Sequence, residues 1–324
     1  MDISIPYYED LSRISNSNIG WFLQKGPAYL HKMLTDPPPE EKNPVLERGT
    51  MIHEYLLQPE EFQKDYVVWN KSRPSSAQQE KFCQALASSV EIEPNKAILS
   101  AYKESYSTKG KSDDLMLSEG LKIASTLKDY IDFLKANDGR IMISPWDVKI
   151  LEKIKQNILS HKLAKKILNN NECWKNYHEF HINWSWCGVI QCKSLLDGFT
   201  IDPETKTITI YDLKTTAKLW HFEDSIEMYD YCRQLCYYTM AVEWYLINEM
   251  HEHPEEWKFK YYIIGIDTTG SYEVRVFNIE WHVVDSKRGI IRTALKDIAW
   301  HQENNLWDHS RAYYEGDGSE TLSL

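Results

Sequence analysis

The chain has 324 residues, of which 42% are hydrophobic and 26% are charged, and its formal net charge at pH 7 is −11. This composition is that of a globular protein with a sizeable core. The acidic balance excludes a protein that coats nucleic acid through a broad basic face, although it permits a nucleic acid to be held in a locally basic channel.

The N-terminal part of the chain is predicted to be helical. Residues 15–34 begin with Ser and Asn capping candidates and continue with helical spacing that is interrupted near Gly26-Pro27. Residues 35–44, TDPPPEEKNP, form a loop, and residues 45–58 form a helix that Pro59 stops.

Short helices are expected between residues 75 and 168. Their apolar periodicity is strongest in residues 113–137 and 145–168, and the second of these segments is rich in lysine. Together with the preceding helices, they make residues 1–170 a mainly helical part of the chain.

The pattern changes near residue 174. Residues 174–186 alternate, turn at Cys187-Gly188 and are followed by the apolar residues 189–202. A turn that contains Pro203 then leads into residues 207–214, TITIYDLK. Three such runs joined by short turns predict an antiparallel meander.

Helices and strands both occur in the remainder of the chain. We expect helices at about 219–228 and 229–250, strands at 258–267 and 272–280 joined by a turn at 268–271, and a final helix at about 282–303. Because no repeat and no linker is visible, we predict one domain over residues 1–324, with its sheet-centred core at 174–303.

The compartment is predicted from two features. The N-terminus has neither the basic start nor the apolar run of a signal peptide, and no stretch approaches the roughly 20 apolar residues of a membrane span. Six cysteines occur without a CxxC pair, at positions 83, 173, 187, 192, 232 and 236. A zinc or iron–sulfur site built from the last four was weighed against buried free thiols, and the thiols are favoured because structural clusters use tighter pairs. We therefore expect a cytoplasmic protein with no membrane partner.

Two carboxylates and an ammonium group lie at the ends of neighbouring strands of the meander. Asp197 precedes Gly198, and Asp212 and Lys214 are two residues apart, so that alternation turns both to one face. Since neighbouring strands lie about 4.8 Å apart, both carboxylates are predicted to reach one divalent ion, and oxygen ligands select Mg²⁺ or Mn²⁺ over zinc. Lys214 would orient or deprotonate an attacking water, and the Leu213 carbonyl would complete the metal shell.

Each of these signals also has an ordinary structural explanation. An isolated Asp-x-Lys is usually a solvated strand end, and an Asp before Gly is usually a turn residue. Two further pairs of residues are candidates for the same site: Gln234 with Tyr238, and Gly49 with His53. The members of each pair are four residues apart and therefore lie on one helix face. A core aromatic beside a polar rim residue would explain the first pair, and a satisfied core histidine the second.

In chain order, the motif residues are Gly49-x-x-x-His53, Asp197, Asp212-x-Lys214 and Gln234-x-x-x-Tyr238. This order resembles the signature of PD-(D/E)XK nucleases of the RecB type. Residues 13–34 and 48–62 make the chain more specifically similar to the RecE, or exodeoxyribonuclease VIII, group of phage and prophage exonucleases, over about residues 10–300. The resemblance implies an α/β fold with a restriction-endonuclease-like core, in which helices flank a mixed central sheet, and a helical N-terminal half.

The resemblance also implies a role for each motif residue. His53, Asp197 and Asp212 would bind Mg²⁺ or Mn²⁺ together with the backbone carbonyl of Leu213, and Lys214 would be the water-activating or transition-state-stabilising base. No iron–sulfur cluster is implied, because no cysteine follows the Gln/Tyr helix, where cluster-bearing relatives place a cysteine group. We also expect a contact to a second metal from Glu179, and DNA contacts from Gln234, Tyr238, Arg48 and Lys193.

The implied activity is metal-dependent 5′→3′ degradation of one strand of linear double-stranded DNA, which leaves 3′ single-stranded tails for recombination. The implied partners are DNA ends, a single-strand-annealing recombinase, and further copies of the chain in a trimeric or tetrameric ring in a bacterial host cell. The lysine-rich residues 149–166 are the candidate lining, although the solvated face of a helix would also explain them.

Two alternatives stay open. One is a related nuclease of another polarity, as in CRISPR adaptation. The other is a non-catalytic protein that binds DNA ends on the same fold. The intact set of His53, Asp197, Asp212 and Lys214 argues against the second alternative, because inactive relatives would be expected to have lost one of them.

Overall fold

A computed structural model describes residues 5–39, 43–136, 139–168 and 175–319. Backbone contacts divide the chain into two compact units, residues 1–59 with 151–324 and residues 60–150. The sequence led us to expect one domain. The division has a physical basis, because the helices of the second unit bury a separate apolar cluster that includes Phe82, Ala101 and Ile131.

Among the described residues, five strands of the first unit form one mixed sheet in the order β3-β4-β5-β6-β7. The first three strands form the predicted antiparallel meander. β6 then pairs parallel to β5, and β7 pairs antiparallel to β6. The strands are β3 (Lys175–Trp186), β4 (Ile190–Asp202), β5 (Thr207–Thr216), β6 (Lys258–Asp267) and β7 (Val274–Ile279).

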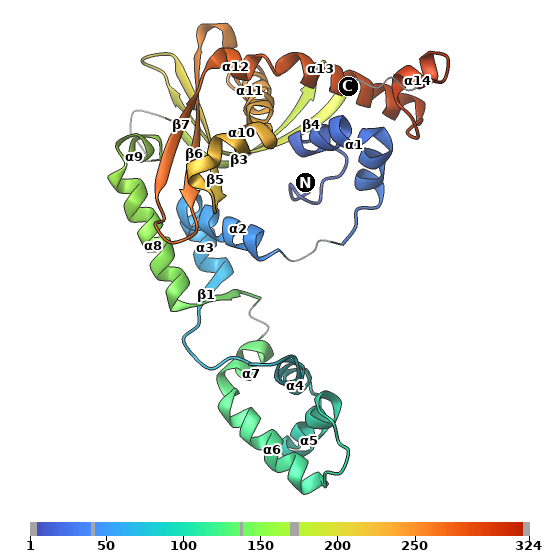
Figure 1. Cartoon of the computed structure of the whole chain (residues 1–324), viewed down its shortest axis with the longest axis vertical. Coiled ribbons are helices and arrows are strands. Elements are labelled where there is room, and N and C mark those ends of the chain that lie inside the picture. The colour runs from blue at the N-terminus through green and yellow to red at the C-terminus, as the bar shows by residue number, and fades with distance from the viewer. Residues whose placement is uncertain (1–4, 40–42, 137–138, 169–174, 320–324) are drawn as a thin grey trace. The chain divides into compact units, whose positions relative to one another are not determined.

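The parallel pairing of β5 and β6 requires a crossover connection. It is made by a 3₁₀ turn (Leu219–His221), α10 (Phe222–Met228) and α11 (Tyr231–Asn248). α11 packs against β3, β4 and β5, and α1 (Asn16–Thr35) and α13 (Arg288–Asn304) pack around α11, as Figure 1 shows. The core between these helices and the sheet includes Ile19, Ile210, Leu235 and Ile298.

The N-terminal helices begin and bend where their sequence predicts. The Ser15 hydroxyl accepts a hydrogen bond from the Asn18 N–H, and the Asn18 side chain accepts one from the Ser15 N–H, which makes a reciprocal cap at the start of α1. Gly26, directly before Pro27, leaves the helical region with φ of 82°, so α1 is kinked at the predicted position. α2 (Pro44–Leu57) ends ahead of the predicted proline.

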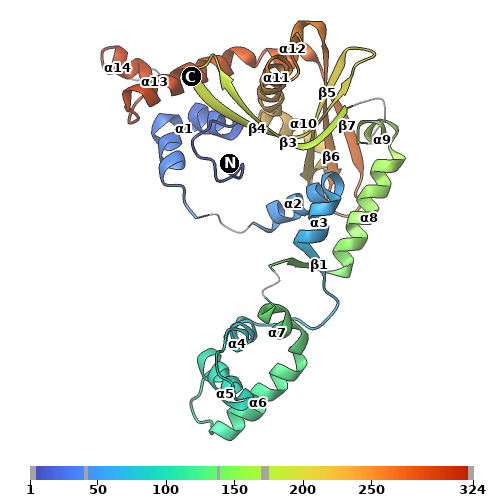
Figure 2. The ribbon, with the colours of Figure 1, turned by 180° about the vertical axis from the view of Figure 1, so that it is seen from behind.

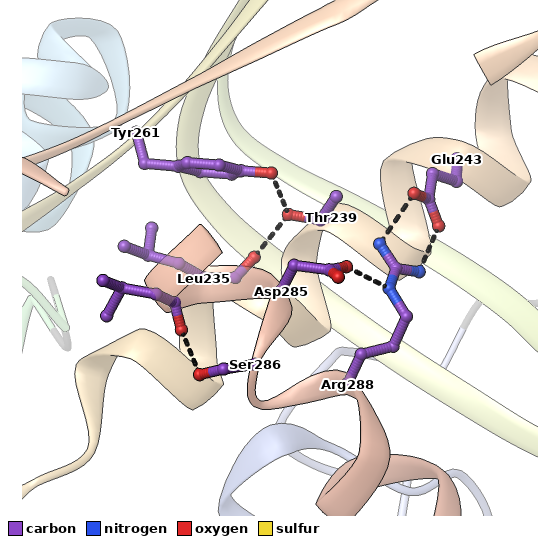
Figure 3. Close-up of polar contacts among 8 residues, drawn as sticks. Leu235, Thr239, Glu243, Tyr261, Asp285, Ser286 and Arg288 are labelled. Carbon is purple, nitrogen blue, oxygen red and sulfur yellow. Dashed lines mark hydrogen bonds and ion pairs between the residues drawn. The ribbon is translucent and has the colours of Figure 1, made fainter. Parts of the chain in front are cut away.

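Polar contacts tie α11 to the C-terminal helices and to β6 (Figure 3). The Arg288 guanidinium donates to both carboxylate oxygens of Glu243, at 2.7 and 2.8 Å, and to Asp285 at 2.8 Å. Thr239 lies 3.2 Å from the Tyr261 hydroxyl. A bidentate Arg–carboxylate pair fixes orientation as well as distance. These contacts hold α11, whose first turns carry two of the predicted site residues.

The other helices of the first unit are short. α9 (Lys162–Leu168) packs beside β7 (Figure 2). α12 (Trp281–Asp285) and α14 (Arg311–Glu315) lie before and after α13, and a 3₁₀ turn (Pro254–Glu256) precedes β6. The predicted segment 145–168 consists of two helices, α8 (Pro145–Ser160) and α9, and the division between the two units falls within α8.

The second unit is mainly helical, but it also contains a pair of short parallel strands that the sequence did not predict. Three residues are too few to display a period of two, which is why this pair was missed. The predicted helix 113–137 is divided at Leu127, and residue 137 lies outside the described part. The elements are α3 (Pro59–Asp65), β1 (Tyr66–Val68), α4 (Ala77–Ala87), α5 (Pro94–Ser105), α6 (Asp113–Thr126), α7 (Lys128–Lys135) and β2 (Ile141–Ile143).

The predicted fold class is confirmed: the protein is α/β, with helices that flank a mixed central sheet, and with a mainly helical N-terminal part. In the part of the chain that the structure describes, no helix is long and apolar enough to cross a membrane.

The cysteines follow the prediction with one exception. Cys83, Cys192 and Cys236 are buried and Cys232 is partly buried, as expected for free thiols. Cys187 is exposed, because it occupies the turn between β3 and β4 with a left-handed φ of 52°, so the expectation that it is buried was wrong. Cys173 and residues 40–42 of the predicted loop lie outside the described residues.

Candidate metal and catalytic site

Three carboxylates form a row across β3, β4 and β5. Glu179 lies opposite Asp197 in the antiparallel register of β3 and β4. The pairing of β4 with β5 ends at Gly198 and Tyr211, so one further step along the same register sets Asp197 opposite Asp212. The row therefore lies where β4 and β5 separate, which leaves room between the strands for side chains to converge.

Glu179 has a left-handed backbone in the middle of β3, with φ of 44°. Residues on either side of it form ladder pairs with β4, but Glu179 does not. A residue with a Cβ pays about 1–2 kcal/mol for this conformation. Strain of this kind persists where the surrounding structure enforces it, and it clusters at functional sites. Here it accompanies a carboxylate that faces both Asp197 and His53.

His53 on α2 completes this cluster. Its Nδ1 lies 3.8 Å from Glu179 Oε1 and 3.7 Å from Asp197 Oδ2. α2 approaches β5 closely at Gly49, where a Cβ would lie 3.2 Å from Thr215 Oγ1. This close approach fits the predicted Gly-x-x-x-His spacing, since the histidine one turn later reaches the acids.

Asp212 is held by a second set of side chains. It is only 1% exposed, and Lys214 Nζ lies 2.5 Å from its Oδ2. The Gln234 amide donates to Asp212 Oδ1 at 3.0 Å and to the Tyr238 hydroxyl at 2.8 Å. The predicted Gln234/Tyr238 pair thus braces Asp212 from α11. Its predicted contact with DNA stays a prediction.

Tyr231 also belongs to this face of α11, and it was not among the predicted site residues. Its ring centre lies 5.0 Å from Lys214 Nζ, in a cation–π contact. Its spacing could have identified it, because Tyr231 lies three positions before Gln234 and seven positions before Tyr238. Residues at these spacings lie on the same face of a helix. Tyr231 and Asp212 together fix the ammonium group of Lys214.

The charges of Asp212 and Lys214 depend on each other. Burial raises the pKa of Asp212 to about 6, although the neighbouring ammonium group opposes this. Burial lowers the pKa of Lys214, but the carboxylates of Asp212 and Asp197 outweigh burial and raise that pKa above its ordinary value. Lys214 is therefore an ammonium ion at neutral pH. This state favours charge stabilisation, and both predicted roles of Lys214 stay predictions.

The cluster of His53, Glu179 and Asp197 fits a divalent cation. A metal that binds oxygen or nitrogen at about 2.1 Å keeps any two ligands within about 4.2 Å of each other. The two distances from His53 Nδ1 meet this limit, and both are too long for hydrogen bonds. Ligand atoms of the three residues all lie within 4.8 Å of one another, so any pair beyond about 4.2 Å would have to close by at most about 0.6 Å to bind one metal ion. The two carboxylates favour a hard divalent cation, and the choice of Mg²⁺ or Mn²⁺ stays a prediction.

This grouping differs from the predicted ligand set. Glu179 joins His53 and Asp197, whereas both oxygens of Asp212 contact other side chains. The Leu213 side chain is buried in the core, and the Leu213 N–H donates to Asp197 Oδ2 at 2.6 Å. The metal-binding roles of Asp212 and of the Leu213 carbonyl stay predictions.

Behind the carboxylate row, Gly198 allows Tyr211 to cross β4. A Cβ on Gly198 would lie 2.1 Å from the Tyr211 hydroxyl, so a side chain there would displace the ring. That hydroxyl lies 2.6 Å from His178 Nδ1. The Asp-Gly pair, which is typical of a turn, is therefore here a packing requirement inside a strand.

The two remaining predicted DNA contacts differ in their surroundings. Lys193 is 6% exposed, and its ammonium group donates to the backbone carbonyls of Tyr7 and Asp10 at 2.6 and 2.5 Å. This burial contradicts the prediction that Lys193 binds DNA, because its charge is used to hold the N-terminal segment. Arg48 lies on α2, one residue before Gly49, and is partly exposed.

Comparison with known proteins supports the fold. No family model matches the sequence, and no curated protein matches it. The chain is similar in structure to a crystal structure of a "putative exonuclease" from Eubacterium rectale, with a TM-score of 0.52 and 13% sequence identity. The similarity covers 100% of this chain and 97% of the other. At this identity, the similarity establishes the arrangement of the elements alone.

Proposed function

We propose that the protein is a metal-dependent nuclease that hydrolyses phosphodiester bonds in DNA. This proposal depends on two groups of side chains that meet at the carboxylate row. One is the cluster of His53, Glu179 and Asp197, and the other is the ammonium group of Lys214, which lies 2.5 Å from Asp212. Phosphodiester hydrolysis requires stabilisation of negative charge on the attacking and leaving oxygens. Carboxylates that hold a cation, with a fixed ammonium group beside them, meet this requirement.

Each side chain has a separate task in this scheme. His53, Glu179 and Asp197 would hold Mg²⁺ or Mn²⁺, with Asp212 and the Leu213 carbonyl at its edge. When bound, the metal would supply Lewis-acid stabilisation of the phosphate and a more acidic water. The chain contributes the Lys214 ammonium, which stabilises charge on the phosphate oxygens.

The finer assignment is a 5′→3′ exonuclease that acts on linear double-stranded DNA and leaves 3′ tails for recombination. It is supported by the ordered motifs that resemble the RecE group, and by the general similarity in fold to a protein described as an exonuclease. The proposed partners are DNA ends and a single-strand-annealing recombinase, within a bacterial cytoplasm.

A ring of three or four copies would reconcile the net charge of −11 with a polyanionic substrate. Residues 149–166 present their lysines to solvent, while Leu151, Ile154 and Ile158 of the same segment are buried. The segment is therefore an amphipathic helical face. Its six exposed lysines, 149, 153, 155, 162, 165 and 166, are available to line a channel between copies.

The test compares Asp197→Asn with Glu204→Gln, an exposed acid in the turn after the same strand. We expect wild type and Glu204→Gln to degrade linear duplex DNA with Mg²⁺ or Mn²⁺ and to stop in excess EDTA. Asp197→Asn should lose cleavage and bind Mn²⁺ at least about tenfold more weakly by calorimetry, since a lost metal interaction of about 1.4 kcal/mol has that effect. Undiminished cleavage in EDTA, or by Asp197→Asn, would contradict the proposal.

A further inference from the structure

Exposed apolar side chains gather on the segment that follows β5. Trp220, Met228 and Tyr229 are 74%, 71% and 58% exposed. β5 carries Asp212 and Lys214, so these side chains come from the connection that leaves the site directly. Large apolar groups that stay in solvent next to a charged site are typical of a surface that contacts a ligand.

One of these side chains is connected to the site by ring contacts. The Tyr229 ring stacks on the Tyr231 ring, with centroids 5.8 Å apart and an angle of 23° between planes. The Tyr231 ring centre lies 5.0 Å from Lys214 Nζ. The exposed ring is therefore at most about 11 Å from the ammonium group, which is about three nucleotide spacings of 3.4 Å along one strand.

The backbone between the two tyrosines is fixed in an unusual conformation. Asp230 has a left-handed φ of 48°. Its carboxylate lies 2.8 Å from Lys287 Nζ and 3.5 Å from Arg233 Nε. Arg233 is 5% exposed and donates to the carbonyl and side chain of Asn16 at 2.8 Å. Contacts from α1, α11 and the α12–α13 connection thus enforce the bend that holds both rings in a stack.

We propose that Tyr229 is a base-stacking subsite for an unpaired nucleotide of the strand whose phosphate lies at Lys214. This inference rests on the proposed nuclease function. A base inside a duplex already stacks on both faces, so a single exposed ring recognises a frayed end or a single strand. Every base has such a face, so the contact is independent of sequence. Because Tyr231 already orders the Tyr229 ring, little conformational freedom is lost on binding.

The test uses a short single-stranded phosphorothioate oligonucleotide, which resists hydrolysis, with fluorescent 2-aminopurine at one of its first four positions. In Mg²⁺, wild type should bind it and quench the fluorescence at one position. Tyr229→Ala should bind about 5- to 140-fold more weakly and lose that quenching, which corresponds to 1–3 kcal/mol for one stacked base. Tyr229→Trp should retain both properties.

Two further variants separate stacking from other effects. Tyr229→Leu, which keeps apolar bulk without a ring, should behave as Tyr229→Ala does. Trp146→Ala removes a ring that is 66% exposed in the second unit and should change neither affinity nor quenching. The subsite would be overturned if Tyr229→Ala bound and quenched as wild type does. It would also be overturned if Tyr229→Leu kept the wild-type affinity and the wild-type quenching.

The subsite and the nuclease function fail in different ways. If wild type does not cleave DNA but its binding of the oligonucleotide depends on Tyr229, the nuclease proposal is wrong and the subsite stands. If cleavage depends on Asp197 as expected and binding is indifferent to Tyr229, only the subsite is refuted.

Discussion

Replacing Glu179 by glycine should make the metal-free protein more stable and remove its activity. Glu179 has φ of 44° inside β3, which costs about 1–2 kcal/mol for a residue with a Cβ. Glycine avoids this cost but loses about 0.4–1 kcal/mol through the greater freedom of the unfolded chain. The expected net gain is about 0.5–1 kcal/mol. Removal of one of three neighbouring carboxylates acts in the same direction, because these groups repel each other without a cation.

The stability change is measured by urea unfolding in EDTA. The free energy of unfolding falls by about 2–3 kcal/mol per 1 M urea, so this gain should raise the urea concentration at the unfolding midpoint by a few tenths of 1 M. Calorimetry should show weaker Mn²⁺ binding, and cleavage should fall by about 10²–10³. Two matched variants separate the effects. Cys187→Gly relieves a similar left-handed residue, with φ of 52°, at the exposed β3–β4 turn, and should gain stability without losing Mn²⁺ affinity. Glu179→Gln should lose Mn²⁺ affinity while the backbone strain stays.

Two outcomes would refute this reasoning separately. A glycine variant that unfolds at lower urea concentration than wild type would show that the Glu179 backbone is not strained. A variant that binds Mn²⁺ and cleaves DNA as wild type does would show that its carboxylate has no part in the site.

Further predictions concern the chemical step, the substrate, acid stability and assembly. Lys214→Met should reduce the rate of single-turnover cleavage by a factor of about 10²–10³. Its affinity for DNA, measured by fluorescence anisotropy, should stay largely intact. A variant that keeps more than about half the wild-type rate would show that Lys214 takes no part in the chemical step. A linear duplex labelled at its 5′ ends should release label early while covalently closed circles survive; rapid loss of circles would indicate an endonuclease. Burial raises the pKa of Asp267, but hydrogen bonds from Ser271 and Thr269 outweigh burial and lower that pKa below its ordinary value. The Asp267 carboxylate therefore stabilises the fold above about pH 4, the ordinary pKa of an aspartate in the unfolded chain. This stabilisation is lost as the pH falls through the lower pKa of the folded state. Asp267→Asn should therefore cost about 1–3 kcal/mol at pH 7, and the difference from wild type in urea unfolding should shrink below pH 4. Light scattering should detect three or four copies, and reversal of charge at Lys153 and Lys165 should weaken DNA binding; a monomer that degrades long duplexes processively would exclude the ring.

Most of the fold was predictable because its signals are local. The kink of α1 follows from Gly26-Pro27, and the meander follows from period-two alternation interrupted at Cys187-Gly188. The parallel pairing of β5 with β6 was not predicted, because it depends on how a crossover of two helices packs on the sheet rather than on any pattern within either strand.

The candidate site was predictable as a set of elements but not as a set of contacts. Alternation indicates the face on which Asp212 lies, but it does not say that Lys214 and Gln234 occupy its two oxygens. The backbone of Glu179 has no local signature, since glutamate in a strand ordinarily has negative φ. Lys193 was misjudged because the carbonyl of Asp10 that holds it comes from 183 residues earlier in the chain.

The position of His53 in the chain has a consequence for folding. Glu179, Asp197 and Asp212 lie on consecutive strands and meet by closing short loops, whereas positions 53 and 179 are 126 residues apart. Contacts between distant residues form late, because the entropy of closing a long loop must be overcome first. We therefore expect the meander to assemble its three carboxylates before α2 docks on β5. A divalent ion that binds the carboxylates at that stage would favour the meander over the unfolded chain, so we expect metal present during folding to stabilise the sheet before α2 closes the site.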